Sequence, residues 1–247
     1  MIRSFRFLAS LCLATAAVAA TAAAPALLSP AWQALQSMFP SAPVSDLEPS
    51  SLEGFQSAVV GGQVVYVSND GGTVILGNVY KGPQHTDIGA QRLTAFRKTA
   101  LASIPAEQRI SFSPPHPKYH VTAFIDIDCP YCRKLHEQIA QFNAAGIAID
   151  YVLFPLDIHP NARAKAQAVW CEKDRKEALS NALNGQEGTT GTCANPIDAL
   201  RKAGMAIGVN GTPALYTADG VQVGGYVTPE QLLAELNPAQ QVGIAGR

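Results

Sequence analysis

The chain has 247 residues, of which 47% are hydrophobic and 15% are charged. This composition excludes an intrinsically disordered protein, and the length allows one large domain or two modest ones. The 18 basic and 19 acidic residues nearly cancel and no basic run occurs, so a nucleic-acid-binding protein is not indicated. Five cysteines are too few for a disulfide-stapled mini-domain.

The first residues have the pattern of a secretory signal peptide. Arg3 and Arg6 precede an apolar stretch, and small residues with A-x-A-like cleavage sites follow. The stretch is short and Ala-rich for a membrane span of about 20 apolar residues. We therefore expect cleavage after residues 1–22 and no stable membrane anchor. Cleavage removes Cys12, and an even number of cysteines in an exported protein favours an oxidising compartment.

The next part of the chain predicts a small β-rich unit. Residues 25–44 form a Pro-rich lead-in with room for one short helix around 32–39. Three β-rich runs follow, FQSAVV, VVYVS and TVILGNVY, with the hairpin signal NDGG between the last two. Three such strands bury too little surface to be stable alone. We expect this sheet to pack on the rest of the chain or to pair with another copy.

A helix and a Pro-rich segment follow the sheet. Thr86 or Asp87 can cap a helix that runs to about Ser103. One apolar stripe of this helix has helical spacing; it comprises Leu93, Phe96, Ala100 and Ile104. The prolines between 105 and 117 predict an extended linker.

The remainder of the chain alternates between strands and helices. The pattern predicts a strand at 119–127, a helix at 130–145 and a strand at 147–154. A helical region then spans about 160–208 and is broken around 185–192. A hairpin at 214–224 and a helix at 229–236 complete the pattern.

The sequence Cys129-Pro130-Tyr131-Cys132 lies where a predicted strand meets a predicted helix. This spacing places both sulfurs in the first helical turn, and the free N–H groups there favour a thiolate at Cys129. Cys132 would be shielded one turn deeper and would act as the resolving thiol. A structural disulfide and a zinc site that includes His136 are the alternatives. His136 itself is expected on the outer face of the helix, and His159 in a solvated loop.

Two further features lie near the C-terminal end. Cys171 and Cys193 flank a loop rich in Gly, Asn and Thr, and a bond between them fits a structural staple better than a second redox centre. Thr212-Pro213 enters a predicted strand opposite the helix of the cysteine pair. A cis proline there would bring backbone next to the sulfurs.

The motifs FIDIDCPYCRKLHEQ, AVWC and NGTPALYTADG, in this order, resemble the DsbC/DsbG disulfide isomerases of the bacterial periplasm. The resemblance covers about 190 residues and includes the 54–80 segment and the connecting helix. It implies an α+β protein: a thioredoxin-like fold with a helical insertion, a small cystatin-like N-terminal dimerisation domain and a linker helix. The implied divisions are a signal peptide (1–22), a dimerisation domain (23–84), linker helix and Pro-rich linker (85–117) and a catalytic domain (118–240).

The resemblance also implies roles for the site residues. Cys129 is the attacking thiol, Cys132 its partner, and Thr212-Pro213 the cis-Pro loop. The pair Cys171/Cys193 matches the structural disulfide of the DsbC branch, which favours that branch although Pro-Tyr is closer to DsbG. No organic cofactor or metal is required.

One departure from the wider thioredoxin pattern concerns buried acid groups. Many thioredoxin-like proteins carry a buried acid six residues before the first active cysteine, where this chain has Ala123. Asp126 and Asp128 lie nearer, on the same face by strand alternation, and are expected to be loop-end carboxylates that mildly raise the thiol pKa.

These features predict a periplasmic thiol–disulfide isomerase that acts on misfolded, disulfide-containing periplasmic proteins. The resemblance implies a homodimer and a membrane reductant of the DsbD type that keeps the pair reduced. A DsbA-like net oxidase and a holdase chaperone with incidental cysteines are the alternatives.

Overall fold

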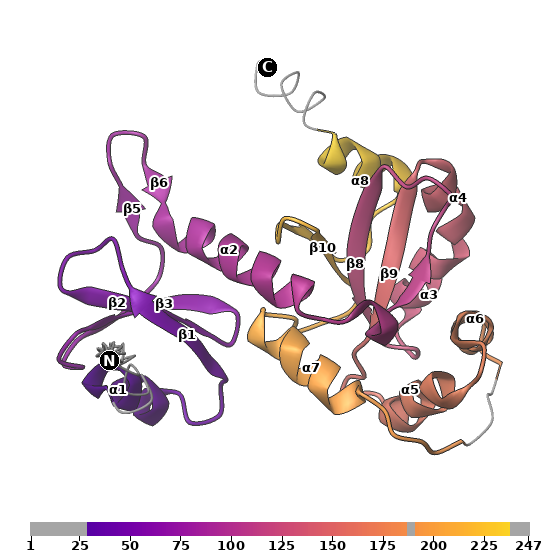
Figure 1. Cartoon of the computed structure of the whole chain (residues 1–247), viewed down its shortest axis with the longest axis horizontal. Coiled ribbons are helices and arrows are strands. Elements are labelled where there is room, and N and C mark those ends of the chain that lie inside the picture. The colour runs from indigo at the N-terminus through magenta and orange to yellow at the C-terminus, as the bar shows by residue number, and fades with distance from the viewer. Residues whose placement is uncertain (1–28, 187–190, 238–247) are drawn as a thin grey trace, which may run out of the picture.

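The computed structural model describes residues 29–186 and 191–237, and the predicted signal peptide lies outside them. The chain forms an N-terminal unit and a larger C-terminal unit, joined by one helix (Figure 1). In the N-terminal unit the elements are α1 (Pro30–Met38), β1 (Val44–Pro49), β2 (Phe55–Val60), β3 (Gln63–Ser68), β4 (Val74–Leu76), β5 (Tyr80–Lys81) and β6 (Thr86–Asp87). In the described part of the chain, no helix is both long and apolar enough to cross a bilayer.

The N-terminal sheet is antiparallel in the order β1-β2-β3-β4, and α1 covers one of its faces. Leu35 of α1 is fully buried against the apolar side chains that alternate along β2 and β3. The predicted short helix, the strands and the hairpin are present. The unit therefore has a core of its own, which three strands without α1 would lack.

Two features of this unit differ from the sequence prediction. β1 begins at Val44, the last residue of the predicted lead-in, and continues through residues for which no element was predicted. A register shift between Ser45 and Glu48, with Asp46 at φ 57°, disrupts the alternation that would reveal it. The run TVILGNVY is not one strand. It breaks after Leu76 at Gly77, whose φ is +127°, and its end forms a separate hairpin, β5–β6.

The connecting helix α2 (Ile88–Ala102) begins at Asp87, whose side chain accepts a hydrogen bond from the Ala90 N–H. Its last turn enters the core of the C-terminal unit, where Leu101 and the following Ile104 are buried. A short 3-10 turn, η2 (Ala106–Gln108), leads to β7 (Ile110–Phe112). β7 pairs with β9 of the larger sheet, so the segment predicted to be an extended linker contains a strand. The prolines 114, 115 and 117 follow this strand and do not interrupt it.

The C-terminal unit is built on a five-stranded sheet in the order β11-β10-β8-β9-β7. Its strands beyond β7 are β8 (Tyr119–Ile125), β9 (Ile147–Leu153), β10 (Ala214–Thr217) and β11 (Gln222–Gly224). Its helices are α3 (Pro130–Glu137), α4 (Ile139–Ala144), α5 (Ala162–Cys171), α6 (Arg175–Leu183), α7 (Ile197–Ala206) and α8 (Pro229–Leu236). β8 and β9 are parallel, and every residue of β9 is buried. Such burial on both faces explains why every residue of β9 except Asp150 is apolar or aromatic.

Two clusters of buried side chains lie on opposite faces of this sheet. One face carries Ala123 and Ile125 of β8 against residues of α3 to α6 and α8. The other carries Phe124 of β8 against α7 and the end of α2. The helix predicted over 130–145 is divided at Gln138 into α3 and α4. The prediction of a mixed helix–strand protein with a thioredoxin-like unit is confirmed.

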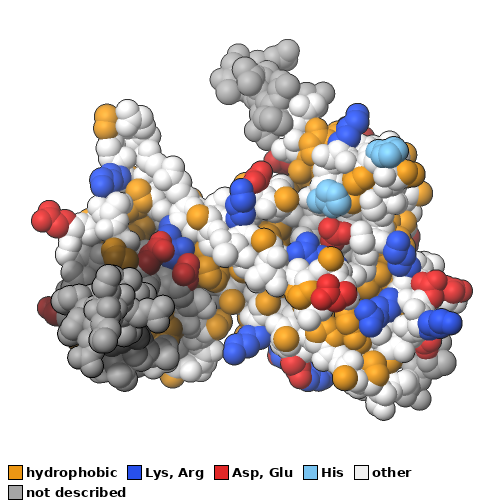
Figure 2. Space-filling model, in the orientation of Figure 1, with side chains coloured by type: hydrophobic (Ala, Val, Ile, Leu, Met, Phe, Trp, Pro, Cys, Tyr) orange, Lys and Arg blue, Asp and Glu red, His pale blue; other side chains and the backbone are white. Residues whose placement is uncertain are grey.

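The two units also touch directly, beside the helix that joins them (Figures 1 and 2). Gly62, in the β2–β3 turn, lies so close to Gly208 that a Cβ added to Gly62 would sit 2.0 Å from the Gly208 Cα. Arg97 Nε of α2 donates to the Ile207 carbonyl at 2.9 Å, and Lys98 pairs with Asp219 at 2.9 Å. The N-terminal unit and α2 are therefore held against the C-terminal unit by backbone and side-chain contacts.

A disulfide joins Cys171 at the end of α5 to Cys193 in the segment before α7, with a Cα–Cα distance of 5.7 Å. It encloses α6, and the two cysteines are 22 residues apart in sequence. Closing a loop of this length restricts the unfolded chain by about 3–4 kcal/mol.

We expect the double substitution Cys171→Ser and Cys193→Ser to lower the melting temperature by destabilising the protein by about 3–4 kcal/mol. Thermal unfolding followed by circular dichroism measures this change. Because both sulfurs of this bond are paired and the free thiols are Cys129 and Cys132, we expect reduction of a simple disulfide to continue near the parent rate. A variant that is folded but has lost this turnover would show that the bond serves the chemistry.

Candidate active site

The two free cysteines of the described chain lie at the start of α3, directly after the central strand β8 and its short loop. Cys129 is the N-cap residue and is 6% exposed, whereas Cys132 lies one turn further and is fully buried. Pro130 occupies the first helical position, where no backbone donor is needed. The backbone N–H groups of Tyr131 and Cys132 in the first turn therefore act on the Cys129 sulfur.

The environments of the two sulfurs shift their pKa values in opposite directions. A hydrogen bond from the Cys132 thiol is the largest influence that lowers the pKa of Cys129 to about 5, with help from Thr212 and backbone N–H groups. Burial, and then the neighbouring Cys129, strongly raises the pKa of Cys132. At neutral pH the pair therefore holds one thiolate, at Cys129, and one thiol, at Cys132.

The loop before β10 completes the site. The peptide bond between Thr212 and Pro213 is cis, and β10 then pairs with β8 from Ala214. In its protonated form Cys129 donates through Sγ to the Thr212 carbonyl at 3.1 Å. The Thr212 hydroxyl is buried and has no hydrogen-bond partner in the described structure, so it is free to donate to a thiolate at Cys129.

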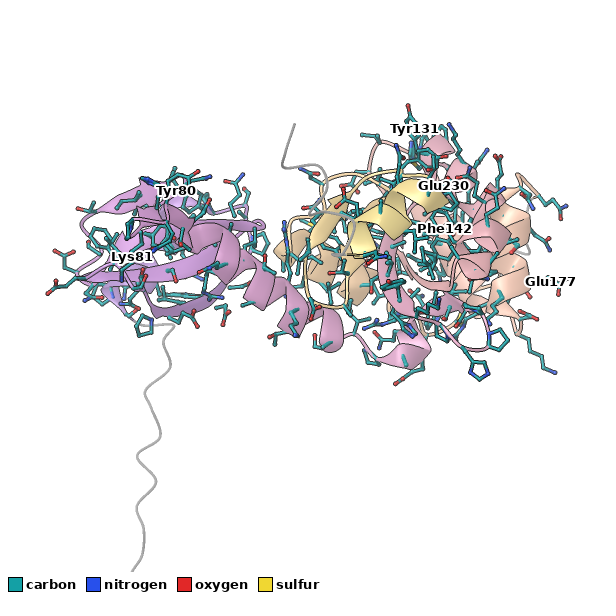
Figure 3. All side chains as sticks on the ribbon, turned by 90° about the horizontal axis from the view of Figure 1, so that it is seen from above. Tyr80, Lys81, Tyr131, Phe142, Glu177 and Glu230 are labelled. Atoms are coloured by element: carbon teal, nitrogen blue, oxygen red, sulfur yellow. A yellow bond between two sulfur atoms is a disulfide. The ribbon has the colours of Figure 1, made fainter. Side chains whose placement is uncertain are left out.

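Two aromatic side chains pack together beside the start of α3, Tyr131 of the cysteine motif and Tyr226. Tyr131 is 60% exposed and points outward from the C-terminal unit (Figure 3). Its ring lies 6.2 Å from that of Tyr226, and the Lys134 Nζ lies 4.7 Å from the Tyr226 centroid. The sequence prediction missed Tyr226, which is separated from the cysteine motif by almost one hundred residues and lies in no recognisable motif.

Asp126 and Asp128 do not play the part expected of them. Asp126 is fully buried, accepts hydrogen bonds from the Asp128 and Leu156 N–H groups, and lies 3.0 Å from His159 Nδ1. Neither carboxylate is among the groups that shift the pKa of Cys129. β8 ends at Ile125, so strand alternation does not extend to these two residues. His159, expected to be solvated, is instead the partner of a buried carboxylate.

Asp128 has a different environment from Asp126. Its Oδ1 pairs with Lys165 at 2.6 Å and with Arg133 at 3.3 Å. These two cations come from α5 and α3, so Asp128 links the inserted helices to the active-site helix.

The expected position of His136 is also wrong. Its side chain is buried, with Nε2 at 2.9 Å from Ser180 Oγ and Nδ1 at 3.3 Å from Tyr151 Oη. It lies four residues after Cys132 and therefore on the same face of α3, which α6 covers. Among the described residues, no group of three or more His, Cys, Asp or Glu is arranged to hold a metal ion.

Comparison with known proteins matches both units to family models. Residues 107–240 match the thioredoxin-like domain, and residues 15–87 match the disulfide bond isomerase protein N-terminal domain. Thiol:disulfide interchange protein DsbC of Escherichia coli K12 is 31% identical over 201 residues, which are 80% of this chain and 83% of that protein. Its counterpart in Dickeya dadantii is 32% identical over 195 residues, 78% and 80% of the respective chains.

Among solved structures, the chain is similar to a disulfide interchange protein from Neisseria gonorrhoeae, with 27% identity and a TM-score of 0.48. That likeness covers 53% of this chain and 97% of the gonococcal one.

We expect Thr212→Val to raise the pKa of Cys129, because the substitution keeps the shape of the side chain and removes its hydroxyl. In the parent, the rate of Cys129 alkylation by iodoacetamide should have its midpoint at about pH 5. The variant should shift this midpoint upward. An identical profile in the two proteins would show that the hydroxyl does not stabilise the thiolate.

Proposed function

The chain belongs to the DsbC family of thiol:disulfide interchange proteins, and we propose that Cys129 and Cys132 carry out its exchange chemistry. The protein isomerises or reduces non-native disulfides. The observation that supports the assignment of this pair is the opposite shift of the two pKa values at the start of α3. One sulfur is ready to attack at neutral pH, while the other retains its proton.

In the proposed cycle, the Cys129 thiolate attacks one sulfur of a substrate disulfide. A bond forms between Cys129 and that sulfur, and the other substrate sulfur leaves as a thiolate. A second substrate thiolate can then attack the mixed disulfide, which restores Cys129 and gives a new pairing. Alternatively, Cys132 attacks Cys129, which releases a reduced substrate and leaves the enzyme oxidised.

The loop at Thr212 and Pro213 serves this cycle by its position. Its carbonyl at residue 212 lies 3.1 Å from the Cys129 sulfur, and its hydroxyl is free to donate to the thiolate. We assign a role to this loop at the step in which the mixed disulfide breaks. It then stabilises the Cys129 thiolate that is released. Cys171 and Cys193 have no part in the exchange and hold the inserted helices together.

The proposed compartment is the periplasm, reached through the signal peptide predicted at residues 1–22. Isomerisation in an oxidising compartment requires the Cys129 pair to be kept reduced, and a membrane reductant of the DsbD type would supply the electrons. The substrates would be misfolded periplasmic proteins with wrong disulfides.

A DsbA-like net oxidase would instead keep the Cys129–Cys132 pair oxidised in cells, and a holdase would act without Cys129. The DsbC relatives favour the isomerase.

The N-terminal unit, within residues 23–84, is proposed to join two copies of the chain. β4 is an edge strand of its four-stranded sheet, and Leu76 at the end of β4 is 61% exposed. Tyr80 of the projecting β5–β6 hairpin is 60% exposed (Figures 1 and 3). An open strand edge beside large exposed apolar side chains is a surface that a second copy would cover.

We expect Cys132→Ala to accumulate mixed disulfides with substrate proteins, because the resolving thiol is absent. Non-reducing gel electrophoresis of cell extracts detects these adducts. Cys129→Ala is the matched control: it should form no adducts and should neither reduce nor isomerise disulfides. If adducts persisted in that control, the attacking thiol would have to be another cysteine.

Deletion of the residues between the signal peptide and Gly82 should give a folded monomer. It should still reduce simple disulfides, because the Cys129 site is complete, but it should isomerise scrambled proteins poorly without the shared surface of two copies. Analytical ultracentrifugation and reactivation of scrambled ribonuclease measure the two effects. A full-length chain that sediments as a monomer at micromolar concentration would contradict this proposal.

A further inference from the structure

A cavity of about 420 Å³ lies between the active-site helix and the inserted helices α5 and α6. Its walls come from the loop before Cys129, one face of α5 and the end of α6; they include Ile127, Asp128, Ala164, Ala168, Val169 and Ala182. α5 and α6 lie side by side at one end of the C-terminal unit (Figure 1). Protein interiors have few voids larger than a water molecule, whereas ligand pockets measure about 300–1,000 Å³. The volume is therefore that of a binding site and not that of a packing defect.

The walls of this cavity are apolar and are held in place. Ala164 and Ala168 are four residues apart on one face of α5, and Ala182 lines the cavity from α6. The disulfide between Cys171 and Cys193 ties the end of α5 to the segment before α7, which also contributes to the lining. The space between the inserted helices is thus a fixed feature of the fold.

The cavity adjoins the attacking cysteine along the chain. Ile127 and Asp128 line it and directly precede Cys129. Arg133 of α3 lines it as well, and its Nε donates to the Ile127 carbonyl at 3.1 Å. Among the described lining residues, none belongs to the cis-Pro loop. A substrate chain bonded to Cys129 therefore reaches the cavity within a few residues, at about 3.8 Å per residue, without displacing that loop.

The rim of the cavity has a surplus of positive charge. Asp128, Arg133 and Lys165 are the charged side chains among its described lining residues. Asp128 Oδ1 lies 2.6 Å from Lys165 Nζ and 3.3 Å from Arg133 Nη2, so one carboxylate meets two cations. Both cations are partly exposed. A guanidinium has five N–H donors and an ammonium has three, so both groups keep donors for a second carboxylate.

We propose that this cavity binds a segment of the substrate protein in which a large apolar side chain is followed by a carboxylate. The apolar side chain enters the space between α5 and α6, and the carboxylate pairs with Arg133 and Lys165. The proposal rests on the assignment of Cys129 as the attacking thiol. Large apolar side chains are mostly buried in folded proteins and become accessible when a protein is misfolded. The cavity would therefore favour substrates that still need their disulfides rearranged.

Activated peptides test this site in the reduced, full-length protein. Each peptide is a Gly/Ser chain with one cysteine, which forms a mixed disulfide with 5-thio-2-nitrobenzoate. The Cys129 thiolate attacks the peptide sulfur and forms a bond with it, and the bond to the coloured thiolate breaks and releases that thiolate. A Leu-Asp pair is placed in turn at each position within three residues on either side of the cysteine. Stopped-flow absorbance measures the rate of release.

In at least one placement, the Leu-Asp peptide should react about tenfold faster than the corresponding Ser-Asp peptide, because burial of the leucine side chain stabilises the complex. A Leu-Lys peptide should react more slowly than the Leu-Asp peptide, since its ammonium meets the two cations of the rim. This second difference should shrink as the salt concentration rises.

Two substitutions test the two parts of the site separately. Ala164→Phe fills the cavity from an exposed position of α5 and should bring the Leu-Asp rate to within twofold of the Ser-Asp rate. Lys165→Gln should reduce the difference between the Leu-Asp and Leu-Lys peptides. Ala234→Phe is the matched control, because Ala234 is an exposed alanine of α8 that does not line the cavity. This control should keep the peptide preferences of the parent.

Equal rates for the Leu-Asp and Ser-Asp peptides in every placement would overturn the proposal. A preference for leucine that persists in folded Ala164→Phe would also overturn it, as would a Leu-Lys peptide as fast as the Leu-Asp peptide at low salt. If Ala164→Phe does not fold, as judged by circular dichroism, the parent series and Lys165→Gln decide. If Cys129→Ala released the coloured thiolate at the parent rate, the assignment of the attacking thiol would fail instead, and the two failures are thus distinct.

Discussion

The hydrogen bond from the Cys132 thiol to the Cys129 sulfur is the interaction on which the site depends. It requires one sulfur to be charged and the other to be neutral, and the fold provides these two environments within a single helical turn. Cys129 lies among the free N–H groups at the start of α3, while Cys132 is enclosed by the core. The Thr212 side chain of the cis-Pro loop lowers the pKa of both thiols, but burial outweighs this effect at Cys132.

This asymmetry links the redox state to stability. The pKa of Cys129 in the folded, reduced protein is about 5, well below the value of about 8.5 for a free thiol. The thiolate therefore adds stability to the reduced form that is complete above about pH 8.5 and is lost as the pH falls toward 5. The oxidised form has no thiolate and lacks this contribution. Near neutral pH the fold thus favours the reduced pair, which is the state that can attack a wrong disulfide.

The amino-acid sequence predicted those parts of the site that are local. The strand-to-helix junction at Cys129 and the Pro213 loop follow from short-range patterns, and the strands and helices around them form as expected. His136 could not be placed in this way. The polarity of α3 suggests an outer position for this residue, but α6, some 40 residues later, adds a second layer over the helix. The pairing of Asp126 with His159, like the place of Tyr226, likewise depends on loops that are far apart in the sequence.

The close approach of Gly62 and Gly208 affects how the N-terminal unit is oriented relative to the C-terminal unit. At this point the two units meet main chain to main chain, with no rotatable side chain between them. At this contact the approach of the two units is limited by atomic radii, which do not vary with rotamer. In a pair of chains joined through their N-terminal units, the distance between the two Cys129 sulfurs would therefore vary little. Substrates would then be sorted by their size as well as by the accessibility of their disulfides.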